Sequence, residues 1–523
     1  MQVRSQSAAA SPNFADAPQA AAGTPLLDSL LGLAAARADA RPVPPADSLS
    51  QLLAASSPLA ALRQLFGDDL RIGRKQAARL LDAAVARIDT LLSRQVNAVV
   101  HHPRLQSLEA SWRGLDYLRD QARQELARAE ELGENVRIVL RVLSATKREL
   151  RDDASTASQF DQSAIFRAVY ESEFGHAGGE PFGLLIGDYE FRNHPDDLDT
   201  LASLGAVAAA SFAPFVAAAA PQFFGLDDFQ KLEIGLPLEK DFQRPDYIQW
   251  RELRQSEDMR FVGLTLPRVL MRVPYHLDVE RQDGFRFSED VAQSDKRQRY
   301  LWGNAAYAFG SVVLRAFVET SWFADIRGFE RGVATGGLVS GLAVDSFSTD
   351  RVGVGLKTST EVVIGGDQEA ELSELGFIPL SACPGTEFSA FFSNASVHQP
   401  AKFADDVANT NAVMSAMLQY VLCASRFAHY LKVLCRQKIG TLETAESLQS
   451  YLTQWVSGFV ADDAHAKPHV KARYPLRQAE VTVAEIPGHA GAYRLEMKLL
   501  PHYQLHGLSA SLRLVHRLQG PGG

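Results

Sequence analysis

Residues 250–275 read WRELRQSEDMRFVGLTLPRVLMRVPY, and two interpretations of the chain start from this stretch. The apolar run from Phe261 to Leu266 has the composition and length of a buried strand. Charged side chains surround that run: the carboxylates Glu252, Glu257 and Asp258, and the arginines Arg251, Arg254, Arg260, Arg268 and Arg272. In one interpretation, Glu257 and Asp258 are the acid/base pair of a soluble α/β enzyme. In the other, they pair with Arg254 and Arg260 and hold a helix-to-strand junction.

Length and composition describe a globular protein of more than one domain. A chain of 523 residues predicts two or three domains, and 46% hydrophobic with 22% charged residues is the balance of a folded core. The net charge of −9 argues against a protein that binds nucleic acid through its phosphates. The three cysteines, Cys383, Cys423 and Cys435, form no C-x-x-C pair, which favours a reducing compartment such as the cytoplasm.

Helical and strand-like patterns alternate along the chain and predict a mixed α/β (α+β) fold. An Ala/Pro-rich arm over 1–57 precedes a helical region over 58–133. A central α/β region over 134–380 has a glycine-rich β part, and 381–523 form a helix-and-strand domain. Strands are expected at Val136–Leu143, Phe182–Gly187 and Phe261–Leu266, and a helix at Ser163–Glu173. The uncharged, alanine-rich run Leu204–Phe224 is interrupted by two prolines, so we expect a buried helical layer rather than a membrane span.

The C-terminal region has the most regular pattern. It predicts one long helix over Ala412–Lys438, capped by Thr410 or Asn411, and a second helix over 448–459. Alternation then predicts strands that end the chain, and an unpaired edge there would pair with another chain. The residues expected in these inter-subunit strands are Tyr493, Leu495, Met497, Leu499, Leu508, Ala510, Leu512 and Leu514.

Several groups of polar residues suggest ligand sites, and each has a simpler structural interpretation. Asp196, Asp197 and Asp199 stand at the start of an expected helix, where carboxylates complement the helix dipole more simply than they bind a cation. His101 and His102 precede a proline and suit a helix cap. In the expected helix, His429 shares a face with neither Cys423 nor Cys435, so no Cys/His pair is predicted. We therefore expect no catalytic, cofactor-binding or metal-binding residues.

An apolar island lies inside the N-terminal arm. Residues 25–34 read PLLDSLLGLA, which suits two turns of amphipathic helix. Such an island is either a docking peptide for another protein or a helix that packs on its own chain. The candidate docking residues are Leu26, Leu27, Leu30 and Leu31.

An ordered set of motifs resembles the large subunit of the type VI secretion contractile sheath, the TssC/VipB family. Besides the 250–275 stretch, the motifs lie between about residues 95 and 518 in consistent order. They are HPRLQSLEASWRGL (102–115), GDYEF (187–191), PQFFGL (221–226), LWGNAAYAF (301–309), ELGFIPL (374–380), SRFAHYLK (425–432) and LPHYQLHGL (500–508).

The resemblance implies a structural role without catalysis. Members of this family pair with a small sheath subunit (TssB/VipA-like), and the heterodimers stack with further copies into a cylinder around an inner tube. The cylinder stands on a baseplate, its contraction expels the tube, and an AAA+ ATPase dismantles the contracted sheath. The resemblance implies neither nucleic-acid binding nor membrane insertion. The arm before residue 58 matches the family least.

Overall fold

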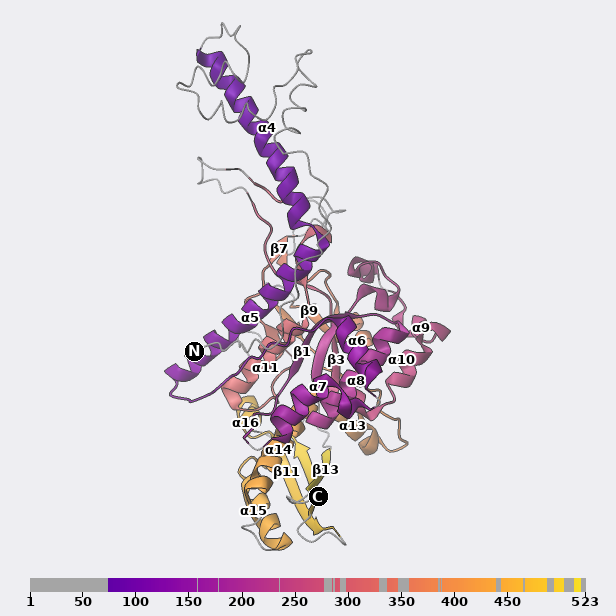
Figure 1. Cartoon of the computed structure of the whole chain (residues 1–523). Coiled ribbons are helices and arrows are strands. Elements are labelled where there is room, and N and C mark those ends of the chain that lie inside the picture. The colour runs from indigo at the N-terminus through magenta and orange to yellow at the C-terminus, as the bar shows by residue number, and fades with distance from the viewer. Residues whose placement is uncertain are drawn as a thin grey trace. The chain divides into compact units, whose positions relative to one another are not determined.

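The computed structural model (Figure 1) describes residues 74–157, 159–176, 178–234, 236–276, 285, 287–291, 298–328, 336–346, 357–383, 386, 388–438, 444–463, 466–486, 493–502 and 512–518. The chain divides into two compact units. The first comprises residues 1–100 with 275–289, and the second comprises residues 101–274 with 290–523. The described chain contains both helices and strands, which confirms the mixed α/β class.

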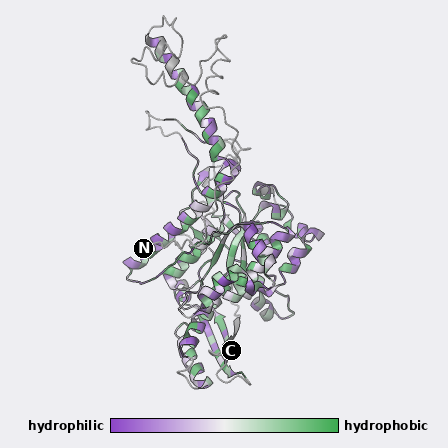
Figure 2. Ribbon diagram, in the orientation of Figure 1, coloured by the Kyte–Doolittle hydropathy of each residue, from purple (hydrophilic) through white to green (hydrophobic). Residues whose placement is uncertain are grey.

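The described part of the first unit contains one long helix and a short closed segment. Helix α4 covers Arg74–Val100. It mixes hydrophilic and hydrophobic residues along its length (Figure 2), and Ile88 is 46% exposed. The second segment of this unit is closed at its ends, where the Glu289 N–H donates to the Tyr275 carbonyl at 2.8 Å. The Tyr275 N–H in turn donates to Glu289 Oε2 at 3.0 Å.

A six-stranded sheet forms the centre of the second unit, in the order β1-β2-β3-β9-β10-β6. The first four strands, β1 (Leu185–Phe191), β2 (Phe215–Ala219), β3 (Val262–Leu266) and β9 (Ile378–Ala382), run parallel. The last two, β10 (Ser389–Phe391) and β6 (Leu338–Val339), pair antiparallel. The strand expected at 261–266 is therefore confirmed, and the strand expected at 182–187 begins three residues later.

Helices cover both faces of this sheet because successive strand residues point to opposite sides. Phe215, Ala217 and Ala219 of β2 join a cluster that includes helix α8 (Pro195–Ser211). Val216 between them joins a second cluster with helix α11 (Ala306–Thr320). Helix α5 (Pro103–Glu131) packs on α11, where a Cβ atom at Gly114 would overlap the ring of Tyr307.

The helical layer expected over 204–224 is wrong in its second half. Helix α8 ends at Ser211, and Phe215–Ala219 form strand β2, in which all five residues are buried. A parallel strand covered on both faces reads as a continuous apolar run, so periodicity cannot separate it from a buried helix. Among the helices of the described residues, none is long and apolar enough to cross a membrane.

The strand expected over 136–143 is also wrong. The chain between α5 and helix α6 (Lys147–Thr156) is extended but belongs to no sheet of the described residues (Figure 1). A strand requires a hydrogen-bonded neighbour, and an alternating sequence cannot supply one. The helix expected over 163–173 is present as a turn of α7 (Ala164–Phe166) followed by a π-helix, η2 (Arg167–Gly175).

The expected single helix over 412–438 is two helices. Helix α13 covers Asp406–Ser415 and is capped by Asp405, whose carboxylate accepts the Ala408 N–H at 3.1 Å, so neither Thr410 nor Asn411 is the cap. Helix α14 then covers Leu418–Lys438. The break follows from tertiary pairing, since Ala416 accepts the Ser396 N–H at 2.8 Å. Helix α15 (Ala445–Ser457) confirms the expected second helix.

The remaining elements are short, apart from three C-terminal strands. They are η1 (Phe160–Gln162), η3 (Pro221–Phe224), η4 (Phe229–Ile234), α9 (Leu238–Asp241), η5 (Pro245–Tyr247), α10 (Ile248–Leu253), η6 (Glu257–Phe261), β4 (Val269–Leu270), β5 (Trp302–Gly303), β7 (Asp345–Ser346), β8 (Lys357–Thr358), α12 (Gly366–Glu374), α16 (Pro468–Arg473), β11 (Leu476–Glu485), β12 (Tyr493–Pro501) and β13 (Leu512–Leu518).

Candidate assembly interface and polar networks

The C-terminal strands form a separate antiparallel sheet in the order β11-β12-β13. One face packs on α14 and α15, where Leu495, Met497 and Leu499 are at most 1% exposed. Intervening residues such as Arg494 and Lys498 are exposed. The alternation expected for β12 is therefore confirmed. The expected third strand is present at Leu512 and Leu514, which belong to β13, whereas Leu508 and Ala510 lie outside the described residues.

The two edges of this sheet differ. At the β11 edge, the Val483 N–H donates to Gln449 Oε1 of α15 at 3.0 Å, and the Leu476 N–H donates to the Phe459 carbonyl at 3.3 Å. The Val483 N–H therefore points away from β12. Successive backbone N–H groups along a strand point to alternate sides of that strand. Val483 pairs with Leu495, and Leu495 pairs with His516. In this register the N–H groups of Arg513, Val515 and Arg517 point away from β12. Among the described residues, no strand pairs with that outer edge of β13.

The charged residues of 250–275 do not form one cluster. Arg260 pairs with Glu257 at 2.7 Å near the surface, where the Glu257 side chain is 72% exposed. Arg254 contacts neither carboxylate. It is buried and donates to the Val397 carbonyl at 3.0 Å and to the Glu374 carbonyl at 2.8 Å. No ion pair of Asp258 occurs within the described ranges. Burial lowers the pKa of Arg254 to about 10, so the guanidinium remains charged at neutral pH.

The described geometry therefore gives the junction role to Arg254 more than to the carboxylates. Arg254 directly follows α10, and its guanidinium donates to the carbonyl of Glu374, the last residue of α12, and to the carbonyl of Val397. Backbone carbonyls carry no sequence signature, so these partners could not be identified from residue types. That the four residues Arg254, Glu257, Asp258 and Arg260 together hold a junction remains a prediction.

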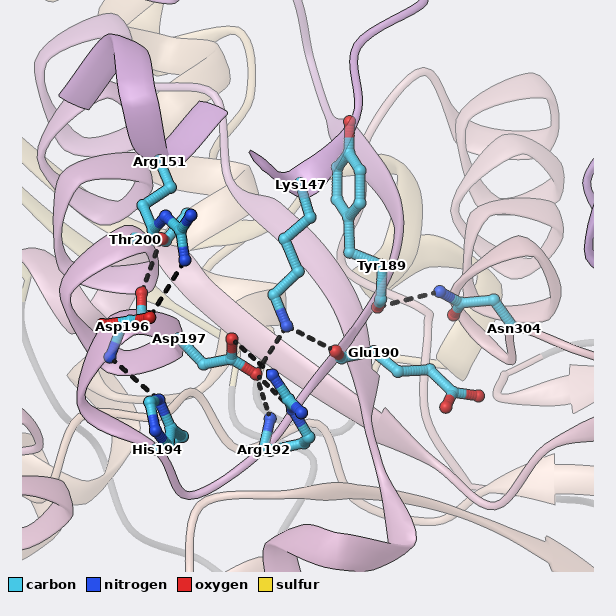
Figure 3. A network of polar contacts seen from close by, with 10 residues as sticks. All are labelled: Lys147, Arg151, Tyr189, Glu190, Arg192, His194, Asp196, Asp197, Thr200 and Asn304. Carbon is cyan, nitrogen blue, oxygen red and sulfur yellow. Dashed lines mark hydrogen bonds and ion pairs between the residues drawn. The ribbon is translucent and has the colours of Figure 1, made fainter. Parts of the chain in front are cut away.

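A second polar network, absent from the sequence-based expectations except for its aspartates, lies at the end of β1 (Figure 3). Asp197 is 5% exposed at its side chain, and its carboxylate accepts from Lys147 Nζ at 2.5 Å and from Arg192 Nε at 3.2 Å. Burial alone would raise the pKa of Asp197, but the hydrogen bonds from Arg192 and Lys147 outweigh it and lower that pKa. Asp196 points outward and pairs with Arg151 at 2.9 Å.

Asp196 and Asp197 stabilise the N-terminal end of α8. His194 is the N-cap and accepts the Asp196 N–H at 3.3 Å, while Asp196 and Asp197 occupy the first turn, where a negative charge complements the dipole. Asp199 is exposed on the same helix. In the part of the chain that the structure describes, no three His, Cys, Asp or Glu side chains are close enough to hold a metal ion. His102 likewise caps α5, as expected.

Three basic side chains of α14 contact the C-terminal ends of α8 and of the π-helix. His429 Nε2 is 3.0 Å from the Ser211 carbonyl, at the C-terminal end of α8. The Lys432 ammonium lies 3.3 Å from the centre of the Phe174 ring. Arg436 donates to the His176 carbonyl at 2.8 Å and to the Gly175 carbonyl at 3.1 Å, where the π-helix ends. We call His429, Lys432 and Arg436 the α14 seam.

The cysteines beside the α14 seam are not reactive thiols. Burial raises the pKa of Cys423 to about 12 and that of Cys435 to about 11, so both thiols stay protonated at neutral pH. Burial also lowers the pKa of His429 to about 4. The contact of the imidazole is the Ser211 carbonyl, not a thiol. Leu26, Leu27, Leu30 and Leu31, the candidate docking residues, lie outside the described residues.

Comparisons with known proteins agree with this arrangement. A family model for the EvpB/VC_A0108 tail sheath N-terminal domain matches residues 82–398, which include the six-stranded sheet. A model for the EvpB/VC_A0108 tail sheath gpW/gp25-like domain matches residues 407–518, which include the three-stranded sheet. The type VI secretion system sheath protein TssC1 of Pseudomonas aeruginosa is 40% identical over 445 residues, covering 84% of this chain and 86% of that protein. The chain therefore belongs to the TssC/VipB family, the large subunits of the type VI secretion system sheath.

Proposed function

We propose that this chain pairs with a smaller sheath subunit and that the heterodimers stack into a contractile cylinder. The cylinder surrounds an inner tube, stands on a baseplate in the bacterial cytoplasm, and expels the tube by contracting. Family membership supports the sheath role. The observation that carries the assembly step is the outer edge of β13, where the backbone donors of Arg513, Val515 and Arg517 turn away from β12.

The strands β12 and β13 are the proposed link between subunits. A strand from a neighbouring subunit would pair with the outer edge of β13 through main-chain hydrogen bonds. The buried face of β12 would keep each subunit's own sheet on its helices. Such a link joins subunits without fixing the angle between their bodies, which suits a cylinder that changes its helical geometry. The N-terminal residues Leu26, Leu27, Leu30 and Leu31 are the proposed docking peptide for the AAA+ ATPase.

Co-expression tests the assembly. The chain expressed with the small sheath subunit encoded beside it should form tubules visible by electron microscopy. Alone, the chain should be poorly soluble, because its partner-binding surfaces remain uncovered. A monodisperse monomer at high concentration, together with no tubules on co-expression, would contradict the proposal.

A proline tests the strand link separately. Arg513→Pro removes one outward backbone donor and leaves the donors toward β12 in place. We expect the heterodimer to form and tubules to be lost. A matched change, Leu514→Pro, removes an inward donor and should damage the sheet itself. Normal tubules from Arg513→Pro would refute pairing at this edge.

A further inference from the structure

Part of the extended chain between α5 and α6 makes no backbone hydrogen bond to any other described residue. We call Asn135–Ser144 the uncovered segment. Among the described residues, no hydrogen bond involves a backbone N–H or carbonyl of these ten residues. The bonds on either side stop at Glu134, whose N–H donates to the Ala129 carbonyl, and resume at Ala145. The segment therefore has enough backbone N–H and carbonyl groups available to pair with a whole β-strand.

Large apolar side chains are exposed along the same segment. Val139, Leu140, Val142 and Leu143 are 48%, 44%, 70% and 61% exposed. Neighbouring residues of an extended chain point to opposite sides, so both sides of the segment are apolar. An exposed apolar chain with free backbone groups readily pairs with other strands, and native proteins cover such edges. This combination favours a strand as the occupant over a helix, because a helix satisfies its own backbone.

The segment is held in its extended form at both ends. Ile138 is 9% exposed and packs in a cluster with Ala122 of α5 and Val318 of α11. At the other end, the Tyr189 hydroxyl of β1 donates to the Ala145 carbonyl at 2.7 Å. Thr146 then caps α6. An incoming strand would meet a backbone that is already ordered, which reduces the entropy lost on binding.

The cations along the segment already have carboxylate partners. Arg137 pairs with Glu180 at 2.6 Å, and Arg141 pairs with Glu173. Just beyond the segment, Lys147 pairs with Asp197 at 2.5 Å and Arg148 with Asp152 at 3.6 Å. The local charge is therefore largely balanced, and the exposed valines and leucines decide the kind of strand. A strand with apolar side chains on the faces that meet them would complement the segment.

We propose that the uncovered segment binds an apolar strand of the partner chain by strand addition. This inference rests on the proposed function, because the smaller sheath subunit is the partner in which the strand is sought. It adds a second pairing surface, within residues 82–398, to the one proposed at β13. The two surfaces have different roles: the uncovered segment forms the heterodimer, and β13 joins heterodimers to one another.

Hydrogen exchange of the co-purified heterodimer tests the proposal directly. We expect the amides of residues 135–144 to exchange at least tenfold more slowly than in an unstructured peptide of the same sequence. Free exchange of this segment within an intact heterodimer would overturn the inference and leave the sheath proposal standing. Protection that appears only in tubules would also overturn it, because the occupant would then come from a neighbouring heterodimer.

A substitution gives a second, independent readout. Val142→Asp places a carboxylate on an exposed position that needs no repacking, so the chain should fold. It should reduce the amount of small subunit co-purified at least tenfold. Val273→Asp is the matched control, since Val273 is 42% exposed and lies outside the segment. Equal co-purification with both variants would contradict the inference. Failure of the unmodified chain to bind any small subunit would overturn both proposals.

Discussion

Asp197→Asn should destabilise the second unit by about 3 kcal/mol, whereas Asp196→Asn should change its stability by less than about 1 kcal/mol. The two residues are adjacent in the first turn of α8, so the helix dipole acts on both. They differ in burial: the Asp197 side chain is 5% exposed and that of Asp196 is 53% exposed. Asparagine cannot carry the charge that Lys147 and Arg192 contact.

The magnitude follows from the exposure of each partner. Removing one member of a buried ion pair costs about 3–5 kcal/mol, and an exposed pair contributes about 0–1 kcal/mol. Lys147 is 26% exposed, so its pair with Asp197 falls near the lower end of the buried range. Arg192 is 54% exposed and adds less than about 1 kcal/mol. A loss of about 3 kcal/mol lowers the ratio of folded to unfolded chain roughly 150-fold.

Pulse proteolysis in urea, applied to the co-expressed complex, measures this difference. The pH dependence provides a further check. The pKa of Asp197 is lowered in the folded state, so its contribution is present above the unfolded pKa and is lost as the pH falls through the folded pKa. The gap between unmodified chain and Asp197→Asn should narrow below about pH 4. Equal, small effects of Asp196→Asn and Asp197→Asn would refute the reasoning.

Three further changes have distinct expected outcomes. Glu257→Gln should cost less than about 1 kcal/mol and leave tubules intact, because its pair with Arg260 is exposed; lost assembly in electron micrographs would contradict this. The unmodified chain should lose up to about 3 kcal/mol of stability as the pH falls from 6.5 to 4, because the unfolded imidazole of His429 binds a proton that the folded site excludes. His429→Gln should remove this pH dependence. Parallel profiles of urea stability against pH for the two chains would argue against it. Gly114→Ala should destabilise the α5–α11 contact by about 1–3 kcal/mol, and unchanged proteolytic stability would show that the Tyr307 ring moves aside freely.

Elements with a clear period were predictable from the sequence, and elements defined by their neighbours were not. The alternation of Tyr493–Leu499 identified β12, and the short apolar run in 261–266 identified β3. By contrast, β2 is buried on both faces and has no period to reveal it. The segment over 136–143 has the alternation of a strand but no neighbour to pair with among the described residues.

In the candidate sites, too, the residue types were predictable from the sequence, whereas the partners that are distant in the sequence were not. Sequence reasoning found the charged residues of 250–275 but assigned Arg254 a carboxylate partner. Its actual acceptors are backbone carbonyls 120 and 143 residues further along the chain, and no side-chain pattern reports them. The aspartates at the start of α8 were visible, whereas Lys147 as a partner of Asp197 was not, because fifty residues separate the two.

The α14 seam has a mechanical consequence. His429, Lys432 and Arg436 span about 10 Å along the axis of α14. Each contacts a group near the C-terminal end of α8 or of the π-helix. A pull along α14 would therefore load these attachments together, in shear, rather than peel them apart one after another. Bonds loaded in parallel share the force. The three attachments thus divide any tension between α14 and the ends of α8 and of the π-helix.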